Sequence, residues 1–148
     1  MKTLGKHFLL ELYDCDVAAL NSLPDLRENM VIAAKEAGAT VVGEVFHQFS
    51  PHGVSGVVVI AESHFSIHTW PEHNYAAVDL YTCGNTVDPT VAANKIADAL
   101  KSKTIRIREL FRGLITDEGS LLREEALDRT SFPWRVPERQ PIKEGYHG

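Results

Sequence analysis

The sequence predicts an α+β domain in which an antiparallel sheet carries helices on one face. The first observation behind this class is the order of the periodic segments, which reads β-α-β-β-β-β-α-β along the chain. The second is size and composition, because 148 residues with 44% hydrophobic and 24% charged residues are typical of one globular domain. The third is the turn-rich segment SPHG (residues 50–53), which separates two strand-like runs.

The first half of the chain contains a predicted strand, a helix and a second strand. Lys6–Tyr13 (KHFLLELY) suits a strand, although its apolar run is unusually continuous. Ser22 and Pro24 are typical of a helix start, and Gly38 stands where a helix commonly stops. Thr40–Phe49 returns to alternating, β-branched sequence. Between these strands, apolar residues recur along one helical stripe: Leu23, Leu26, Met30, Ala33, Ala34 and Ala37.

The second half contains three predicted strands, a helix and a last strand. The three strands are Val54–Ile60, Phe65–Trp70 and Tyr75–Tyr81. Asp88 followed by Pro89 is a strong helix start, with the aspartate as N-cap and the proline at the first helical position. Lys103–Phe111 alternates again and predicts a strand with one solvated face. The helix stripe expected to be buried comprises Val91, Ala92, Ile96, Ala99 and Leu100.

The character of the sequence changes after residue 112. Residues 113–148 carry many charges and three prolines, so we expect a peripheral extension beside a domain formed by residues 1–112. Within this extension we expect at most one short helix, near Leu121–Leu127. Phe132 and Trp134 are its candidates for docking onto the domain.

The composition also limits the possible cellular location and the possible binding partners of the protein. A formal charge of −5, from 15 basic and 20 acidic residues, argues against a nucleic acid or an anionic membrane as partner. We see neither a membrane-spanning apolar run nor a signal peptide, and two cysteines do not make a disulfide framework. A soluble, cytoplasmic protein is therefore expected. Because helices on one face leave the other face of the sheet uncovered, we also expect self-association through the sheet.

Reactive side chains are concentrated in residues 62–84, which read ESHFSIHTWPEHNYAAVDLYTCG. Zinc is one interpretation, because His64 and His68 are four apart and Cys83 follows. A structural zinc site needs four ligands, usually in tight local pairs, and the sequence offers no such pairs, so we predict no metal. His64 is better interpreted as a partly exposed strand histidine.

A serine hydrolase is the second interpretation of this stretch. The signature G-x-S-x-G is absent around Ser63, although GVSG (residues 53–56) places Ser55 between glycines. GVSG precedes an apolar strand rather than joining a strand to a helix, so a nucleophile elbow is a poor fit. From the residues alone, GVSG favours a tight turn that leads into a buried strand.

The third interpretation makes Ser63 a nucleophile against its own backbone. Its hydroxyl would attack the carbonyl of Glu62 and form an ester, a step that needs only proximity and backbone strain. Elimination of the ester breaks the chain and leaves a pyruvoyl group, whose ketone is an electron sink. His68 suits the required base by its pKa, and Cys83 suits a later proton donor. Spacing alone leaves this interpretation open.

The run GVSGVVVIAESHFSIHTWPEHNYAAVDLYTCG (residues 53–84) resembles the core of the small prokaryotic S-adenosylmethionine decarboxylases. The resemblance continues more weakly from Gly5 to about Gly113, through FHQFSPHGVSG and the helix after CGNTVDP. Enzymes of this family cleave themselves to create a pyruvoyl cofactor. The resemblance implies a homodimer of processed αβ protomers, (αβ)2, in which two sheets pack together as a four-layer αββα sandwich. The uncovered sheet face inferred above agrees with that arrangement.

The resemblance implies a role for each processing residue. Cleavage falls between Glu62 and Ser63, giving a β chain of residues 1–62 and an α chain of residues 63–148 whose Ser63 becomes the pyruvoyl group. His68, in SIHTWPE, is the implied base for processing. Ser55, in GVSG, is implied to bond to the processing intermediate, which revises the purely structural interpretation of that turn.

The resemblance also implies the reaction and the substrate-binding residues. S-adenosylmethionine would lose its carboxylate as carbon dioxide through a Schiff base, giving the aminopropyl donor for spermidine synthesis. Cys83, in YTCG, is implied to return the proton. Glu72 is implied to hold the ribose hydroxyls, a natural use of a carboxylate, and Phe49 to stack on adenine. Without the resemblance, Glu72 would be interpreted as a solvated turn acid and Phe49 as core.

Two other functions remain open at this point. Relatives with the same core decarboxylate arginine or ornithine, so the cleavage motif does not fix the substrate. A homologue that stays uncleaved and binds a ligand or partner is the second alternative, although all the processing residues are present. Phe49 and Glu72 favour the nucleoside substrate.

Overall fold

The computed structural model describes residues 2–123, and residue 1 and residues 124–148 lie outside the described part. The predicted order of strands and helices is confirmed, with two short helices added. The elements are β1 (Lys2–Tyr13), α1 (Val17–Leu20), α2 (Leu23–Glu36), β2 (Val41–Gln48), β3 (Val54–Ile60), β4 (Ser63–Trp70), the 3-10 helix η1 (Pro71–His73), β5 (Tyr75–Thr82), α3 (Pro89–Ala99) and β6 (Thr104–Ile115).

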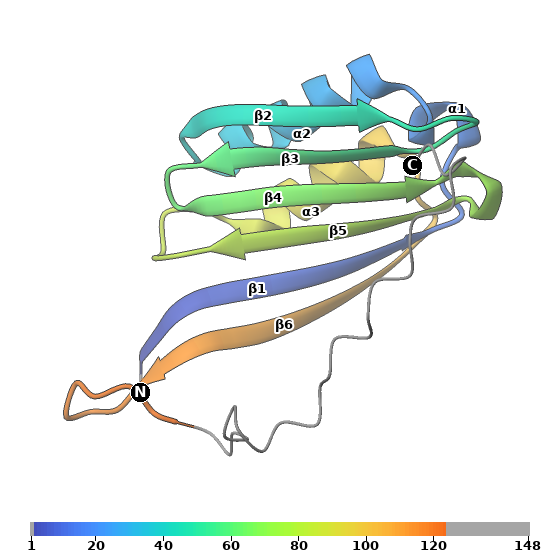
Figure 1. Ribbon diagram of the computed structural model, residues 1–148. Coiled ribbons are helices and arrows are strands. Elements are labelled where there is room, and N and C mark those ends of the chain that lie inside the picture. Colours follow the sequence, from blue (N-terminus) through green and yellow to red (C-terminus); the bar gives the residue numbers. More distant parts are fainter. Residues whose placement is uncertain (1, 124–148) are drawn as a thin grey trace, which may run out of the picture.

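The strands form one six-stranded sheet in the order β2-β3-β4-β5-β1-β6, and all paired strands are antiparallel. Figure 1 shows α2 and α3 on one face of this sheet, while no described helix covers the other. We call the uncovered side the open face. The predicted α+β class is thus confirmed.

The core lies between the sheet and the helices because the strand sequences alternate. In β4 the buried residues are Phe65, Ile67 and Thr69, and in β5 the even-numbered residues from 76 to 82 are buried. Their neighbours in the sequence therefore point to the open face. The helices contribute small residues to this core, including Ala33 and Ala34 of α2, which let the helix backbone approach the sheet closely.

The helix starts follow the predicted capping chemistry. Asp88 is the N-cap of α3, where its Oδ1 accepts a hydrogen bond from the backbone N–H of Thr90 at 2.9 Å. The buried residues of α3 are Ala92, Ala93 and Ile96, with Leu100 at its end. The prediction that Val91 is buried was wrong, because it lies on the outer flank of the stripe with 39% of its surface exposed.

Strand β6 differs from its prediction in length and in exposure. It continues to Ile115, and most of its residues are exposed on both faces rather than on one. The reason is its position at the edge of the sheet, where Ile107 on the helix side remains 50% exposed. Residues 121–123 form no helix, and the rest of the segment predicted as a short helix, with Phe132 and Trp134, lies outside the described residues. Over residues 2–123, no helix has the length and apolarity to cross a membrane.

Candidate functional site

A tight turn between β3 and β4 positions the predicted cleavage bond. Ile60 pairs with Ser63, so only Ala61 and Glu62 form the turn. The backbone N–H of Cys83, just past the end of β5, donates a hydrogen bond to the carbonyl oxygen of Glu62 at 2.9 Å. That oxygen belongs to the bond that Ser63 would attack. A fixed N–H at this position can stabilise the negative charge that develops on the oxygen during attack.

Ser63 itself has an unusual backbone conformation. Its φ of 156° lies outside the range of ordinary strands, and L-amino acids seldom adopt it. Its Oγ lies 3.3 Å from Nδ1 of His64, whose ring packs against Tyr81 with a centroid distance of 5.7 Å. From the sequence, His64 was interpreted only as a partly exposed strand residue. The structure makes it the histidine that contacts the candidate nucleophile.

Ser55 and His68 form a second cluster at the other end of the β3–β4 hairpin. Their Cα atoms pair across the two strands, and the Ser55 Oγ lies 2.8 Å from His68 Nδ1. His68 follows Ser63 by five strand residues, a separation of about 16 Å at 3.3 Å per residue. Within one chain, the structure therefore does not bring His68 or Ser55 to Ser63.

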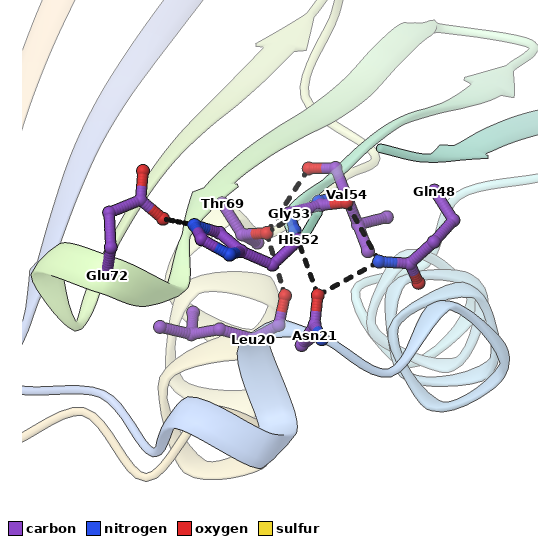
Figure 2. A network of polar contacts seen from close by, with 8 residues as sticks. All are labelled: Leu20, Asn21, Gln48, His52, Gly53, Val54, Thr69 and Glu72. Atoms are coloured by element: carbon purple, nitrogen blue, oxygen red, sulfur yellow. Dashed lines mark hydrogen bonds and ion pairs between the residues drawn. The ribbon is translucent and has the colours of Figure 1, made fainter. Parts of the chain in front are cut away.

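Phe49 and Glu72 belong to the same end of the sheet as Ser55 and His68. Phe49 is half-buried, and its ring meets that of His47 edge-on at a centroid distance of 4.7 Å. It begins the loop of residues 49–53, and Glu72 lies in η1. His52 connects the two segments, because its Nε2 lies 2.8 Å from Oε2 of Glu72, as Figure 2 shows.

A network of polar contacts from the α1–α2 connection anchors this loop (Figure 2). Oδ1 of Asn21 accepts hydrogen bonds from the Gly53 N–H and from Nε2 of Gln48, both at 2.9 Å. The buried Thr69 hydroxyl accepts a bond from the Val54 N–H at 2.9 Å and donates one to the carbonyl of Leu20 at 2.7 Å. The backbone on the C-terminal side of His52 is thereby fixed by side chains from two other segments.

The two cysteines have different surroundings. Cys83 is exposed beside the candidate cleavage site, whereas Cys15 is buried. Burial raises the pKa of the Cys15 thiol, which keeps it protonated and unreactive. Of the two cysteine thiols, only that of Cys83 is therefore accessible for proton transfer. Among the described residues, no group of three or more histidine, cysteine, aspartate or glutamate side chains is placed to hold a metal ion.

Comparison with known proteins identifies the family. The family described as S-adenosylmethionine decarboxylase matches residues 6–113. The chain belongs to the S-adenosylmethionine decarboxylase family. The resemblance inferred from residues 53–84 is confirmed, and the match also includes most of β1, both long helices and most of β6.

Similarity to individual members of this decarboxylase family supports the family match. The S-adenosylmethionine decarboxylase proenzyme of Thermosipho africanus is 50% identical over 119 residues, which are 80% of this chain and 92% of that protein. The corresponding proenzyme of Bacillus cytotoxicus is 52% identical over 113 residues, or 76% of this chain and 87% of that one. The crystal structure of the adenosylmethionine decarboxylase from Aquifex aeolicus superposes with a TM-score of 0.75 at 42% identity, covering 81% of this chain and 99% of that chain.

Proposed function

We propose that this chain is a self-processing proenzyme that decarboxylates S-adenosylmethionine with a pyruvoyl group derived from Ser63. The observation that supports the proposal most strongly is the hydrogen bond from the Cys83 N–H to the Glu62 carbonyl, within a chain of this family. Because of this hydrogen bond, the carbonyl oxygen of the predicted cleavage site is already held by a donor. The β chain would be residues 1–62 and the α chain residues 63–148.

Processing would begin with attack of the Ser63 Oγ on the carbonyl carbon of Glu62. The C–N bond then breaks, the Ser63 nitrogen takes up a proton, and an ester joins Glu62 to the Ser63 oxygen. The unusual φ of Ser63 lowers the cost of leaving the ground state, because backbone strain is released when the amide becomes an ester. A base then removes the α-proton of Ser63, the Cβ–O bond breaks, and Glu62 leaves as a carboxylate. The enamine left at the new N-terminus tautomerises to an imine, which takes up water and releases ammonia. The ketone that forms is the pyruvoyl group, which supplies an electron sink for an amine substrate.

If His68 is that base, it must belong to a second copy of the chain. His68 is about 16 Å from Ser63 along its own strand, too far for proton transfer. A two-fold axis that lies between two facing sheets and runs across the strands would place the partner's His68–Ser55 pair beside Ser63. Each dimer would then hold two composite sites, since a two-fold interface uses the same surface on both copies.

The open face has the surface expected of such an interface. Val45 is 73% exposed, Val59 is 43% exposed and Trp70 is 39% exposed in the single chain. Their strands place Val59 and Trp70 beside His64 and His68, on the side that no described helix covers. Contact between two such faces would remove apolar surface from water, and we propose the (αβ)2 dimer on this ground.

Cys83 would act twice, first through its backbone and later through its side chain. Its N–H holds the Glu62 carbonyl during processing, and its exposed thiol would protonate the substrate α-carbon after carbon dioxide leaves. A Cys83→Ser variant keeps the N–H, so we expect self-cleavage to continue. Decarboxylation should fall by about 100-fold or more, because a serine hydroxyl is a poor acid near neutral pH. Gel analysis of cleavage and a carbon dioxide assay on the same preparation measure the two effects separately.

Substrate choice would depend on Phe49 and Glu72, which lie at the same end of the sheet as His68 and would therefore face the partner's pyruvoyl group in the composite site. The ring of Phe49 would stack on adenine, and the carboxylate of Glu72 would accept the ribose hydroxyls. We further propose that residues 1–112 form the catalytic unit and residues 113–148 a peripheral extension, because the family match ends at residue 113. A cytoplasmic location is proposed as well, since a reducing compartment keeps the exposed Cys83 thiol free.

Intact-mass analysis combined with a substrate assay tests the proposal. After incubation, the wild-type chain should appear as two fragments that end at Glu62 and begin at residue 63, the larger one resistant to N-terminal sequencing. Carbon dioxide should be released from carboxyl-labelled S-adenosylmethionine but not from labelled arginine or ornithine. Release from arginine or ornithine alone would overturn the substrate. A permanently intact chain would overturn the processing.

A further inference from the structure

A hydrogen bond from His52 holds one oxygen of the Glu72 carboxylate. Nε2 of His52 lies 2.8 Å from Glu72 Oε2, and both side chains are partly accessible, at 40% and 39% exposure. Figure 2 shows the two side chains directed toward one another, from the loop of residues 49–53 and from η1. An N–H at Nε2 donates this bond in the neutral or in the charged imidazole. Among the described contacts, Oε1 of Glu72 has no partner.

The backbones on both sides of this pair are fixed. On one side, Asn21 and Thr69 hold the N–H groups of Gly53 and Val54, next to His52. On the other side, Asn74 is the C-cap of η1. Its side-chain amide donates to the carbonyl of Cys15 at 3.1 Å, and its own carbonyl accepts from the Cys15 N–H at 2.9 Å. Because neither backbone depends on the His52–Glu72 hydrogen bond, the two side chains meet as a result of the fold.

An exposed glutamate without a partner samples many rotamers, and a ligand that needs one of them must bear the entropic cost of selecting it. His52 removes part of this cost before the ligand arrives. It occupies one lone pair of Oε2, and a carboxylate offers about four such positions over its two oxygens. The carboxylate therefore remains able to accept two hydroxyl groups, but in a fixed orientation.

We propose that His52 is a positioning residue for the vicinal hydroxyls of the nucleoside substrate, acting through Glu72. This inference rests on the proposed function, in which Glu72 accepts the ribose hydroxyls. His52 also lies on the loop that begins with Phe49. Through His52, this loop connects Phe49, which would stack on adenine, to Glu72, which would bind the ribose. The bond orients Glu72 for the ribose. Among the described contacts, neither His52 nor Glu72 touches Glu62 or Ser63, so self-cleavage should not depend on this bond.

The test is a double-mutant cycle on the processed enzyme, using His52→Ala, Glu72→Ala and the combination. We expect His52→Ala to raise KM for S-adenosylmethionine about tenfold, with kcat and the rate of self-cleavage unchanged, because only ligand binding loses preorganisation. In the Glu72→Ala background, the His52→Ala change should have no further effect, since the carboxylate through which it acts is absent. His52→Gln, whose amide also donates, should restore most of the wild-type KM.

His73→Ala is the matched control, because His73 is adjacent to Glu72 in the sequence and occupies the same short helix. It should leave KM unchanged. If His52→Ala raised KM equally with and without the Glu72 substitution, the inference would be overturned. It would also be overturned if His52→Ala abolished self-cleavage or lowered the melting temperature, because either result would indicate a structural role. Failure of the wild-type chain to cleave or to act on S-adenosylmethionine would overturn the proposed function instead, so the two failures are distinguishable.

Discussion

Replacing Ser63 with alanine should leave one full-length chain and no detectable decarboxylation of S-adenosylmethionine. The variant lacks the hydroxyl that attacks the Glu62 carbonyl, and without the ester there is no elimination and no pyruvoyl group. No other group can replace the electron sink, so we expect activity to fall by at least about a millionfold, the low end of ordinary enzymatic acceleration. Intact mass and a labelled carbon dioxide assay after prolonged incubation measure both losses.

Ser66→Ala is the control for this experiment. Ser66 lies on the same strand three residues later, where its Oγ donates a hydrogen bond to Asp79 at 3.2 Å. Its loss removes a serine hydroxyl from β4 without touching the turn at Glu62, so cleavage should proceed at the wild-type rate. If Ser63→Ala still yielded a fragment ending at Glu62, the nucleophile would have to be another group and the proposed processing would be wrong.

Local sequence patterns predicted most of the fold. The alternation of buried and exposed residues in β4 and β5 and the Asp88–Pro89 helix start are properties of neighbouring residues, so they can be read from the sequence. Helix α1 was missed because four residues are too short to show a helical period. Val91 was misassigned because apolarity does not reveal which flank of a helical stripe faces the sheet.

The candidate site could be predicted as a set of residues but not as an arrangement. Chemical reasoning on residues 62–84 singled out Glu62, Ser63 and Cys83, and the family resemblance then implied their roles, which stay predictions. The bond between the Cys83 N–H and the Glu62 carbonyl depends on the pairing of β4 with β5, which no local pattern shows. The same limit hid the contact of His52 with Glu72, because the two residues lie on separate connections and meet only after the hairpin forms.

Strand register also decides which residues can share one active site. Because Ser55 pairs with His68 and Ile60 pairs with Ser63, the proposed base and nucleophile occupy opposite ends of a single hairpin. Neither end can move toward the other without breaking the strand pairs between them. A site that needs both groups therefore needs two chains, unless the nearby His64 is the base.

Coexpression of Ser63→Ala and His68→Ala chains should restore cleavage that neither variant shows alone. In a mixed dimer, Ser63 of the His68→Ala chain faces the intact His68 of its partner, so one of the two composite sites is complete. Random pairing of equal amounts places about half of the His68→Ala chains in mixed dimers, and about that fraction should be cleaved. Differently tagged chains, separated by mass, show which variant has been cut. Cleavage of the His68→Ala chain alone, without its partner variant, would assign the base to His64, whose Nδ1 lies 3.3 Å from the Ser63 Oγ.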